Sequence, residues 1–403
     1  MSEKEESESS ESPKESQKES QKESQKESQQ ESQKESQKES QKESQQASQK
    51  ESQQASQKES QQASQQVSQK ESVENKDNKD NKDNKDNKDN KESKDNNDAV
   101  YIKAAEDLRK AMEGFGTDEE ALILVVTSNK TKERLKIKKA YEEKYKKNLI
   151  DDLKSELSGK FEDAMVGLFK EPVEYDCECI YNAMKGAGTD ENCLIEVIAS
   201  RPNWLLEKIK KKYKELYKKE LIEDIKSDTS GDFQKILLGI LRCQRNESKE
   251  VNKENCAKIA NELNNLKEKG WEVQDEQNIF YLYIMNNSPK ELSAVAREYY
   301  KLSGKTIIEG IDNNFKGDAK ELLKSILYSL VSPSEYFATR IKKAIEGFGT
   351  DNKTLIRILI TRCEVDMNII KKYYKQLYKK DMVDDIKSDI SGDYQKLMIE
   401  LIK

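Results

Sequence analysis

The sequence predicts an all-α protein made of four copies of one five-helix repeat, preceded by a disordered tail. Residues 1–98 contain no aromatic residue, whereas the rest of the chain holds all 17 Tyr, 8 Phe and 2 Trp. From Ala99 onward a sequence pattern returns at intervals of about 70 to 80 residues. Within each copy, apolar residues recur at the spacing of an amphipathic helix, so stacked helical repeats are expected.

The tail, residues 1–98, is of low complexity. Glu-Ser-Gln-Lys units run to about Ser72, and Asn-Lys-Asp units follow them. Such a segment buries too little apolar surface to offset the entropy lost on ordering, and we predict that it is disordered. Its 18 Lys and 25 acidic residues give it a net charge of −7.

The four repeats are expected at residues 99–169, 170–243, 254–330 and 333–403, and the third is the most divergent. The second and fourth show the duplication most clearly. Tyr213-Lys-Glu-Leu-Tyr217 corresponds to Tyr374-Lys-Gln-Leu-Tyr378, and Asp224-Ile-Lys-Ser-Asp228 corresponds to Asp385-Ile-Lys-Ser-Asp389.

Each repeat is expected to hold five helices. Ile370, Tyr373, Tyr374 and Leu377 form an apolar stripe with lysines between them, which is typical of an amphipathic helix. Thr117 and Glu120 have the spacing of a capping box, which predicts a helix start directly after a glycine loop. We expect the glycine loops to join the first helix to the second, and an acidic residue to end the fourth.

Three glycine loops are each paired with a distant acid. The loops are Gly114–Thr117, Gly186–Thr189 and Gly347–Thr350, and an acid follows the first glycine of each by 42 positions: Glu156, Asp228 and Asp389. Ca²⁺ takes six to eight oxygen ligands and accepts backbone carbonyls. In the first repeat the candidate ligands are the carbonyls of Met112, Gly114 and Gly116 with the carboxylate of Glu156, which leaves about two positions for water or a lipid phosphate.

Composition excludes several classes of function. The chain has no histidine, which removes the commonest general base and most zinc sites, and a non-enzymatic protein is therefore expected. Residues 99–403 carry a net charge of +1, whereas nucleic-acid binding needs a basic excess. The six cysteines form no regular framework and are expected to be reduced. No apolar run is long enough to span a membrane, which favours a cytoplasmic protein.

The repeated loops, together with Leu149–Phe161 and Asp228-Thr-Ser-Gly231, resemble the annexin family over residues 99–403. The resemblance implies four stacked repeats in a curved disc with calcium-dependent phospholipid sites on its convex face. Carried over residue by residue, it implies Met112, Gly114, Gly116 and Glu156 in the first site. It also implies the following residues in the second and fourth sites: Met184, Gly186, Gly188 and Asp228; Ile345, Gly347, Gly349 and Asp389.

The third repeat departs from the pattern, since it reads Gly270-Trp-Glu-Val-Gln and has Asn314 at the acidic position. We predict that it does not bind calcium in the family's way. The resemblance places Trp271 in contact with a membrane, and Phe115 and Phe348 at the loop tips have the same expected role. The alternative is that each ring folds back on its own repeat.

The resemblance also places Asp176, Glu196, Arg201 and Arg357 along a polar channel, with Cys179 at a normally acidic position. A buried ion-pair network between the two halves of the repeat array is the favoured interpretation of these residues.

The predicted function is Ca²⁺-dependent, peripheral docking on anionic membranes. The prediction extends to bridging of membranes, and it includes no binding of nucleic acid. The alternative is a helical scaffold for a protein or cytoskeletal partner, with the tail as the docking element. Lateral self-association on membranes is a further prediction.

Overall fold

The computed structural model describes residues 86–114, 116–266, 270–347 and 349–403. The chain divides into two units, Met1–Lys88 and Asp89–Lys403. The predicted disorder of the tail falls almost entirely on residues outside the described ones. The structure differs from the prediction at the boundary, because the first described helix already begins at Asp86 rather than after Asp98.

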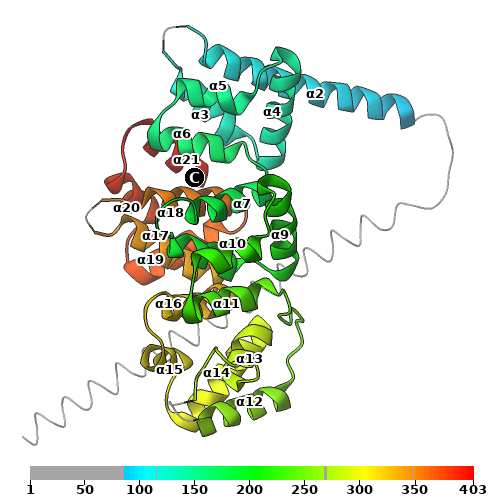
Figure 1. Ribbon diagram of the computed structural model, residues 1–403. Helices are drawn as coiled ribbons and strands as arrows, with labels where there is room; N and C mark the ends of the chain where they lie inside the picture. The colour runs from blue at the N-terminus through cyan, green and yellow to red at the C-terminus, as the bar shows by residue number, and fades with distance from the viewer. Residues whose placement is uncertain (1–85, 115, 267–269, 348) are drawn as a thin grey trace, which may run out of the picture. The chain divides into compact units, whose positions relative to one another are not determined.

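The described part of the chain is helical, with twenty helices that fall into four groups of five (Figure 1). The first group is α2 (Asp86–Ala111), α3 (Glu119–Ser128), α4 (Thr131–Tyr145), α5 (Leu149–Glu156) and α6 (Gly159–Leu168). The second is α7 (Pro172–Ala183), α8 (Glu191–Ser200), α9 (Asn203–Tyr217), α10 (Leu221–Asp228) and α11 (Gly231–Leu241).

The third group is α12 (Lys253–Leu266), α13 (Ile279–Asn286), α14 (Pro289–Ser303), α15 (Ile307–Asn314) and α16 (Gly317–Val331). The fourth is α17 (Pro333–Ile345), α18 (Asn352–Arg362), α19 (Met367–Tyr378), α20 (Met382–Asp389) and α21 (Gly392–Ile402). The prediction of five helices per repeat is therefore confirmed. The glycine loops join the first helix to the second, and the three acids end the fourth helices, as expected.

The apolar stripes of these helices meet in two hydrophobic cores. One core combines the second and third repeats, and the other combines the first repeat with the fourth. Figure 1 shows the last helix, α21, beside α6 and α18, and it also packs on α3. The two ends of the repeat array are thus joined, although they lie far apart in the sequence.

A capping prediction is wrong at the start of α3. Thr117 does not cap this helix; Asp118 is the N-cap, and its carboxylate accepts a 3.0 Å hydrogen bond from the backbone N–H of Ala121. Asp190 and Asp351 cap α8 and α18 in the same way. The threonine hydroxyl is consequently free for another partner.

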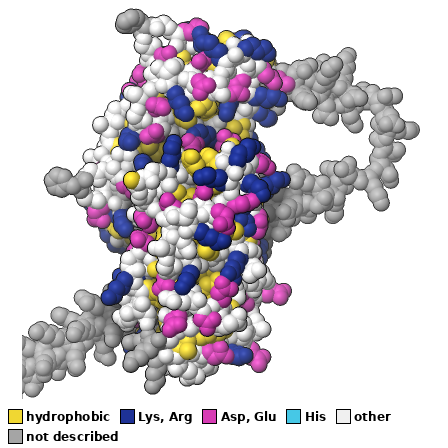
Figure 2. All heavy atoms as spheres, viewed as in Figure 1, with side chains coloured by type: hydrophobic (Ala, Val, Ile, Leu, Met, Phe, Trp, Pro, Cys, Tyr) yellow, Lys and Arg dark blue, Asp and Glu magenta, His cyan; other side chains and the backbone are white. Residues whose placement is uncertain are grey.

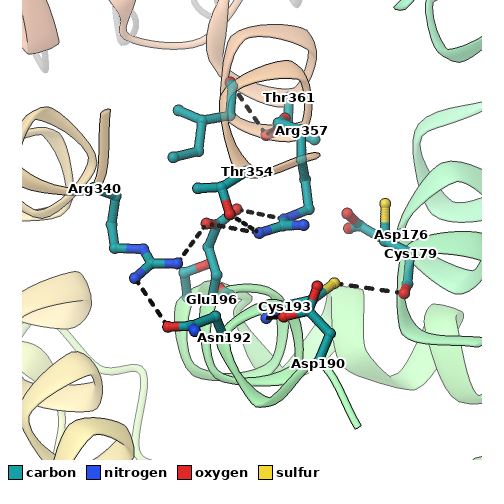
Figure 3. Close-up of polar contacts among 12 residues, drawn as sticks. Asp176, Cys179, Asp190, Asn192, Cys193, Glu196, Arg340, Thr354, Arg357 and Thr361 are labelled. Atoms are coloured by element: carbon teal, nitrogen blue, oxygen red, sulfur yellow. Dashed lines mark hydrogen bonds and ion pairs between the residues drawn. The ribbon is translucent and has the colours of Figure 1, made fainter. Parts of the chain in front are cut away.

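A buried ion-pair network joins the two cores, and Figure 3 shows the part of it around Glu196. Arg201 forms a bidentate pair with Asp176, with both distances 2.8 Å. Glu196, on α8, accepts hydrogen bonds of 2.7 and 3.1 Å from Arg357, on α18. Arg340 approaches the same carboxylate at 3.5 Å. Because Glu196 is 2% exposed and Arg357 is 3% exposed, the predicted network between the halves is confirmed.

The six cysteines are free thiols. Burial raises the pKa of Cys177 to about 12, which keeps this thiol protonated at neutral pH. Cys193 donates a weak hydrogen bond to the carbonyl of Cys179 at 3.5 Å.

Candidate metal centres

The second glycine loop, between α7 and α8, is described throughout. Gly186 has a φ of +106° and Gly188 a φ of +92°, a region of backbone space that favours glycine. A 2.8 Å hydrogen bond from the N–H of Asp190 to the carbonyl of Ala183 closes the loop. The glycines of the first and fourth loops have φ values from +89° to +116°, so the same turn is built three times.

The carbonyl oxygens of this loop are the candidate metal ligands. Among the described residues, no hydrogen-bond donor contacts the carbonyls of Met184, Gly186 or Gly188. Backbone carbonyls are normally paired with protein or solvent, so three neighbouring unpaired oxygens are suited to a hard cation. A metal here would depend on the main chain, because the described residues contain no cluster of three or more Cys, Asp or Glu able to hold one.

The distant acids lie beside their loops. Thr189, which follows the second loop's last glycine, donates a 2.7 Å hydrogen bond to the carboxylate of Asp228. Thr350 donates likewise to Asp389, and Thr117 approaches Glu156 at 3.4 Å. The structure thus brings each loop and its acid together in the first, second and fourth repeats. The sequence analysis missed this contact between the threonines and the candidate acids, although the constant place of the threonine after the second glycine was a usable signal.

A second repeated contact fixes the helices that carry the acids. In the first, second and fourth repeats, the buried tyrosine of the third helix donates a hydrogen bond to a carboxylate in the fourth helix: Tyr141 to Asp152 at 2.6 Å, Tyr213 to Asp224 at 2.7 Å and Tyr374 to Asp385 at 2.7 Å. Burial acts to raise the pKa of Asp385, but the bond from Tyr374 and nearby lysines outweigh it and hold this pKa below its ordinary value. Asp385 therefore remains ionised at neutral pH.

Among its described residues, the third repeat lacks both contacts. At the tyrosine's partner position it has Gly310, and at the acidic position Asn314 turns back to its own helix, where its amide donates to the carbonyl of Gly310 at 2.9 Å. The amide of Asn278 donates to the carbonyl of Gly270 at 2.8 Å, which occupies an oxygen of the corresponding loop. The third repeat therefore differs from the other three at both positions, and the absence of a calcium site of this kind there stays a prediction.

The structure differs from the expectation that Trp271 contacts a membrane. Its side chain is 4% exposed, stacks on Phe280 with ring centroids 4.6 Å apart, and meets the edge of Tyr299. The ring lies directly over Gly310, where an added Cβ would approach it to 2.3 Å. Trp271 thus fills the space beside Gly310, at the position where the other repeats carry an aspartate, and this conformation matches the alternative that the ring folds back on its own repeat. Phe115 and Phe348, the other expected membrane contacts, lie outside the described residues.

Comparison with known proteins agrees with this architecture. The annexin family model matches residues 103–168, 175–240 and 336–401, which lie in the first, second and fourth repeats. Human annexin A11 is 40% identical over 300 residues, covering 74% of this chain and 59% of its own length. Human annexin A4 is 39% identical over 297 residues, covering 74% of this chain and 92% of its own length.

Solved structures show the same fold. A point mutant of annexin A8 with an intact N-terminus has a TM-score of 0.72 and 36% identity, and the match covers 75% of this chain and 94% of that one. Calcium-bound annexin (Sm)1 has a TM-score of 0.66 and 29% identity, and the match covers 75% of this chain and 90% of that one.

None of the helices in the described part of the chain has the length and apolar character that a membrane span requires.

Proposed function

Because the chain belongs to the annexin family, we propose that its first, second and fourth repeats bind Ca²⁺ and dock the protein on anionic phospholipid surfaces. Annexins in general are calcium-dependent phospholipid-binding proteins and are not enzymes. The observation that carries the proposal is the threefold pairing of a glycine loop with one carboxylate, joined by a hydrogen bond from a threonine.

Each site would use main-chain oxygens and one acid. The ligand sets are Met112, Gly114, Gly116 and Glu156; Met184, Gly186, Gly188 and Asp228; and Ile345, Gly347, Gly349 and Asp389. Three carbonyls and a bidentate carboxylate supply five ligands, and Ca²⁺ needs one to three more. Water fills these positions in solution, and a lipid phosphate oxygen replaces it at a membrane.

The charge of the folded repeats makes the metal necessary. Acidic and basic side chains are interspersed on the face shown in Figure 2, and residues 99–403 are nearly neutral. The protein alone therefore offers little attraction to an anionic surface, and the bound cation supplies it. With one formal charge per site, affinity for Ca²⁺ without lipid should be weak, on the order of 10⁻⁵ to 10⁻³ M. Lipid and calcium then raise each other's affinity by linkage.

The test is cosedimentation with vesicles that contain phosphatidylserine, in calcium and in chelator. The wild type should sediment only in calcium, and the triple variant Glu156→Gln, Asp228→Asn, Asp389→Asn should stay in the supernatant. Circular dichroism of the variant checks that it is folded. Vesicle binding that persists in chelator would instead favour the scaffold function, with a protein or cytoskeletal partner for the tail.

Calcium-dependent binding retained by the triple variant would contradict the assignment of these acids. The same proposal includes peripheral attachment to membranes in the presence of calcium. It also includes lateral self-association on the membrane, which cross-linking on vesicles tests.

A further inference from the structure

The third helix of each repeat, with the turn that follows it, is strongly basic. These segments hold 24 Lys or Arg and 9 acidic residues, a net charge of +15, and they are residues 131–148, 203–220, 289–306 and 367–381. The other residues of 99–403 hold 30 Lys or Arg and 44 acidic residues, a net charge of −14. The near neutrality of the folded part therefore conceals a strong separation of charge.

In the first, second and fourth repeats, the third helix lies at the end of the repeat away from the glycine loop. The loop joins the first helix to the second, and the fourth helix ends beside it, as the bond from Thr189 to Asp228 shows. The third helix therefore connects the far end of the second helix to the far end of the fourth. The second helices have 10 or 11 residues, and about 15 Å separates their two ends.

The three glycine loops share one face of the molecule. A cavity of about 520 Å³ lies between the first and fourth repeats, and the acids of both sites, Glu156 and Asp389, line it. A second cavity, of about 420 Å³, is lined by Asp190, which follows the second loop, and by Lys154 and Lys353, which are close in sequence to Glu156 and to the fourth loop. The helices α4, α9 and α19 therefore lie on the opposite face, which we call the basic face.

Several cations of the basic face have no acidic partner. On α9 and in its turn, Lys208, Lys211 and Lys218 are exposed and form no ion pair in the part of the chain that the structure describes. The same holds for Lys375 and Lys379 in the fourth repeat. Exposed ammonium groups of this kind can pair with the carboxylates of a partner.

Three lysines of this face have a strained backbone. Lys146, Lys218 and Lys379 each directly follow a third helix, and their φ values are +54°, +57° and +56°. This left-handed region is unfavourable for a residue with a side chain. In the third repeat the same position is Gly304, with a φ of +71°, so the fold of a repeat accepts glycine there. A binding role of the ammonium groups accounts for lysine where glycine fits the backbone better.

Apolar side chains are exposed among these lysines. Trp204 and Leu216, on α9, are 56% and 38% exposed, and Ile369 and Leu377, on α19, are 47% and 43% exposed. The ammonium of Lys208 lies 5.0 Å from the centre of the Trp204 ring, so cationic and apolar groups share one surface. Exposed apolar groups beside charged ones, tryptophan above all, are typical of protein–protein contacts.

The composition of the basic face favours a polypeptide over other polyanions. Its exposed cations are lysines, whereas the planar fork of arginine is the group suited to phosphates. Glu207 and Glu215 are exposed on α9 among the lysines, and they would repel a nucleic acid or a lipid surface of uniform negative charge. An acidic polypeptide carries carboxylates for the lysines, apolar side chains for Trp204 and Leu216, and basic side chains for these two acids.

We propose that the basic face, formed by α4, α9 and α19 with their turns, is a docking surface for an acidic, amphipathic segment of another protein. Carboxylates of the segment pair with the lysines, and its apolar side chains pack on those exposed beside them. Because the face lies opposite the glycine loops, this binding needs no calcium and leaves the loops open. In calcium the docked protein is carried to the membrane, and only this recruitment rests on the proposed function.

Binding of fluorescent poly-L-glutamate to the full chain in chelator tests the inference, with anisotropy at low salt as the readout. The triple variant Lys146→Gly, Lys218→Gly, Lys379→Gly should bind roughly tenfold more weakly, since three exposed charge pairs are lost. The same variant should unfold at a higher urea concentration than the wild type, because glycine adopts the left-handed conformation with less strain. A damaged fold then cannot explain the weaker binding.

The triple variant Lys154→Gln, Lys235→Gln, Lys353→Gln is the charge-matched control. These lysines are also exposed, but Lys154 and Lys353 line the cavity beside the loops, and Lys235 lies near the start of α11, which follows Asp228. The control should bind polyglutamate like the wild type. Equal losses in the two triple variants, or no loss in the glycine variant, would overturn the inference.

A synthetic helical peptide with glutamate on one face and leucine on the other tests the apolar part of the surface. It should bind more tightly than polyglutamate, and Trp204→Ser should remove that gain while leaving polyglutamate binding unchanged. Equal affinities of the wild type for the two probes would overturn the amphipathic character of the proposed partner.

Polyuridylate and phosphatidylserine vesicles, both in chelator, test the other anionic partners. Each should bind more weakly than the amphipathic peptide, and tighter binding of either would overturn the choice of a polypeptide. The triple variant Glu156→Gln, Asp228→Asn, Asp389→Asn should bind polyglutamate at least as tightly as the wild type. Failure of calcium-dependent vesicle binding would thus contradict the proposed function and leave this docking surface in place.

Discussion

The hydroxyl of Thr189 donates a 2.7 Å hydrogen bond to the carboxylate of Asp228, which lies 39 residues later in the chain. The same pair of positions is in contact in the first and fourth repeats, as Thr117 with Glu156 and Thr350 with Asp389. This contact links the glycine loop to the end of the fourth helix. It orients the carboxylate that the proposed calcium site requires.

Loss of the Thr189 hydroxyl should therefore weaken the second site. We expect Thr189→Val to raise the calcium concentration for half-saturation of this site roughly three- to tenfold, because the carboxylate loses the bond that orients it. Thr189→Ser should restore the wild-type value. Calorimetric titration with calcium in a Glu156→Gln, Asp389→Asn background measures the second site alone. Equal half-saturation concentrations with Thr189 and with Thr189→Val in this background would refute the role of the threonine.

The backbone of the second loop should not tolerate a side chain at Gly188. An added Cβ meets no atom within 4 Å, but the φ of +92° is strained for any residue with a side chain. We expect Gly188→Ala to lower the free energy of unfolding by about 1 kcal/mol or more and to weaken calcium binding by the loop. Ala187→Gly in the same loop is the control for flexibility. Urea unfolding measures both variants, and an unchanged midpoint for Gly188→Ala would contradict the strained geometry.

The burial of Trp271 depends on the absence of a side chain at position 310. We expect Gly310→Ala to destabilise the protein by about 1–3 kcal/mol, since its Cβ would lie 2.3 Å from the indole ring. In a Trp204→Phe background the fluorescence of Trp271 should shift to longer wavelength. In a protein that already carries Trp271→Ala, Gly310→Ala should lower the free energy of unfolding by much less. If Gly310→Ala keeps the short-wavelength emission of its parent protein, the indole ring of Trp271 is not packed against position 310.

The buried pair between Glu196 and Arg357 should stabilise the contact between the two cores. Glu196→Gln leaves the guanidinium of Arg357 buried with no carboxylate at 2.7 Å, and it should lower the unfolding free energy by about 3–5 kcal/mol. Glu298→Gln removes the exposed pair with Lys301 and should have no measurable effect. Similar unfolding midpoints for the two variants would contradict the structural role of the network.

Features that recur in the sequence were predictable. The five helices per repeat, the loop positions and the acids at the ends of α5, α10 and α20 all followed from comparing copies of one repeat, because equal spacing implies equal geometry. The departure of the third repeat was visible for the same reason, since Asn314 replaces an acid. The buried network was predicted from charged residues that the resemblance brought together.

Some contacts between distant segments were not predictable. The burial of Trp271 follows from Gly310, which leaves room for the indole ring, and no local pattern near Trp271 reports this. Thr117 has capping-box spacing, but Asp118 caps the helix and the threonine turns to Glu156 instead. The cavity between Glu156 and Asp389 exists because the last repeat packs on the first, a contact between the ends of the repeat array.

The most direct test of the calcium assignment is a crystal structure determined with calcium, with anomalous differences locating the ions. We predict one ion at each of the first, second and fourth loops, about 2.3–2.6 Å from the glycine carbonyls and from Glu156, Asp228 or Asp389, with no ion of this kind in the third repeat. Empty glycine loops at saturating calcium, or ions bound away from these three acids, would contradict the assignment.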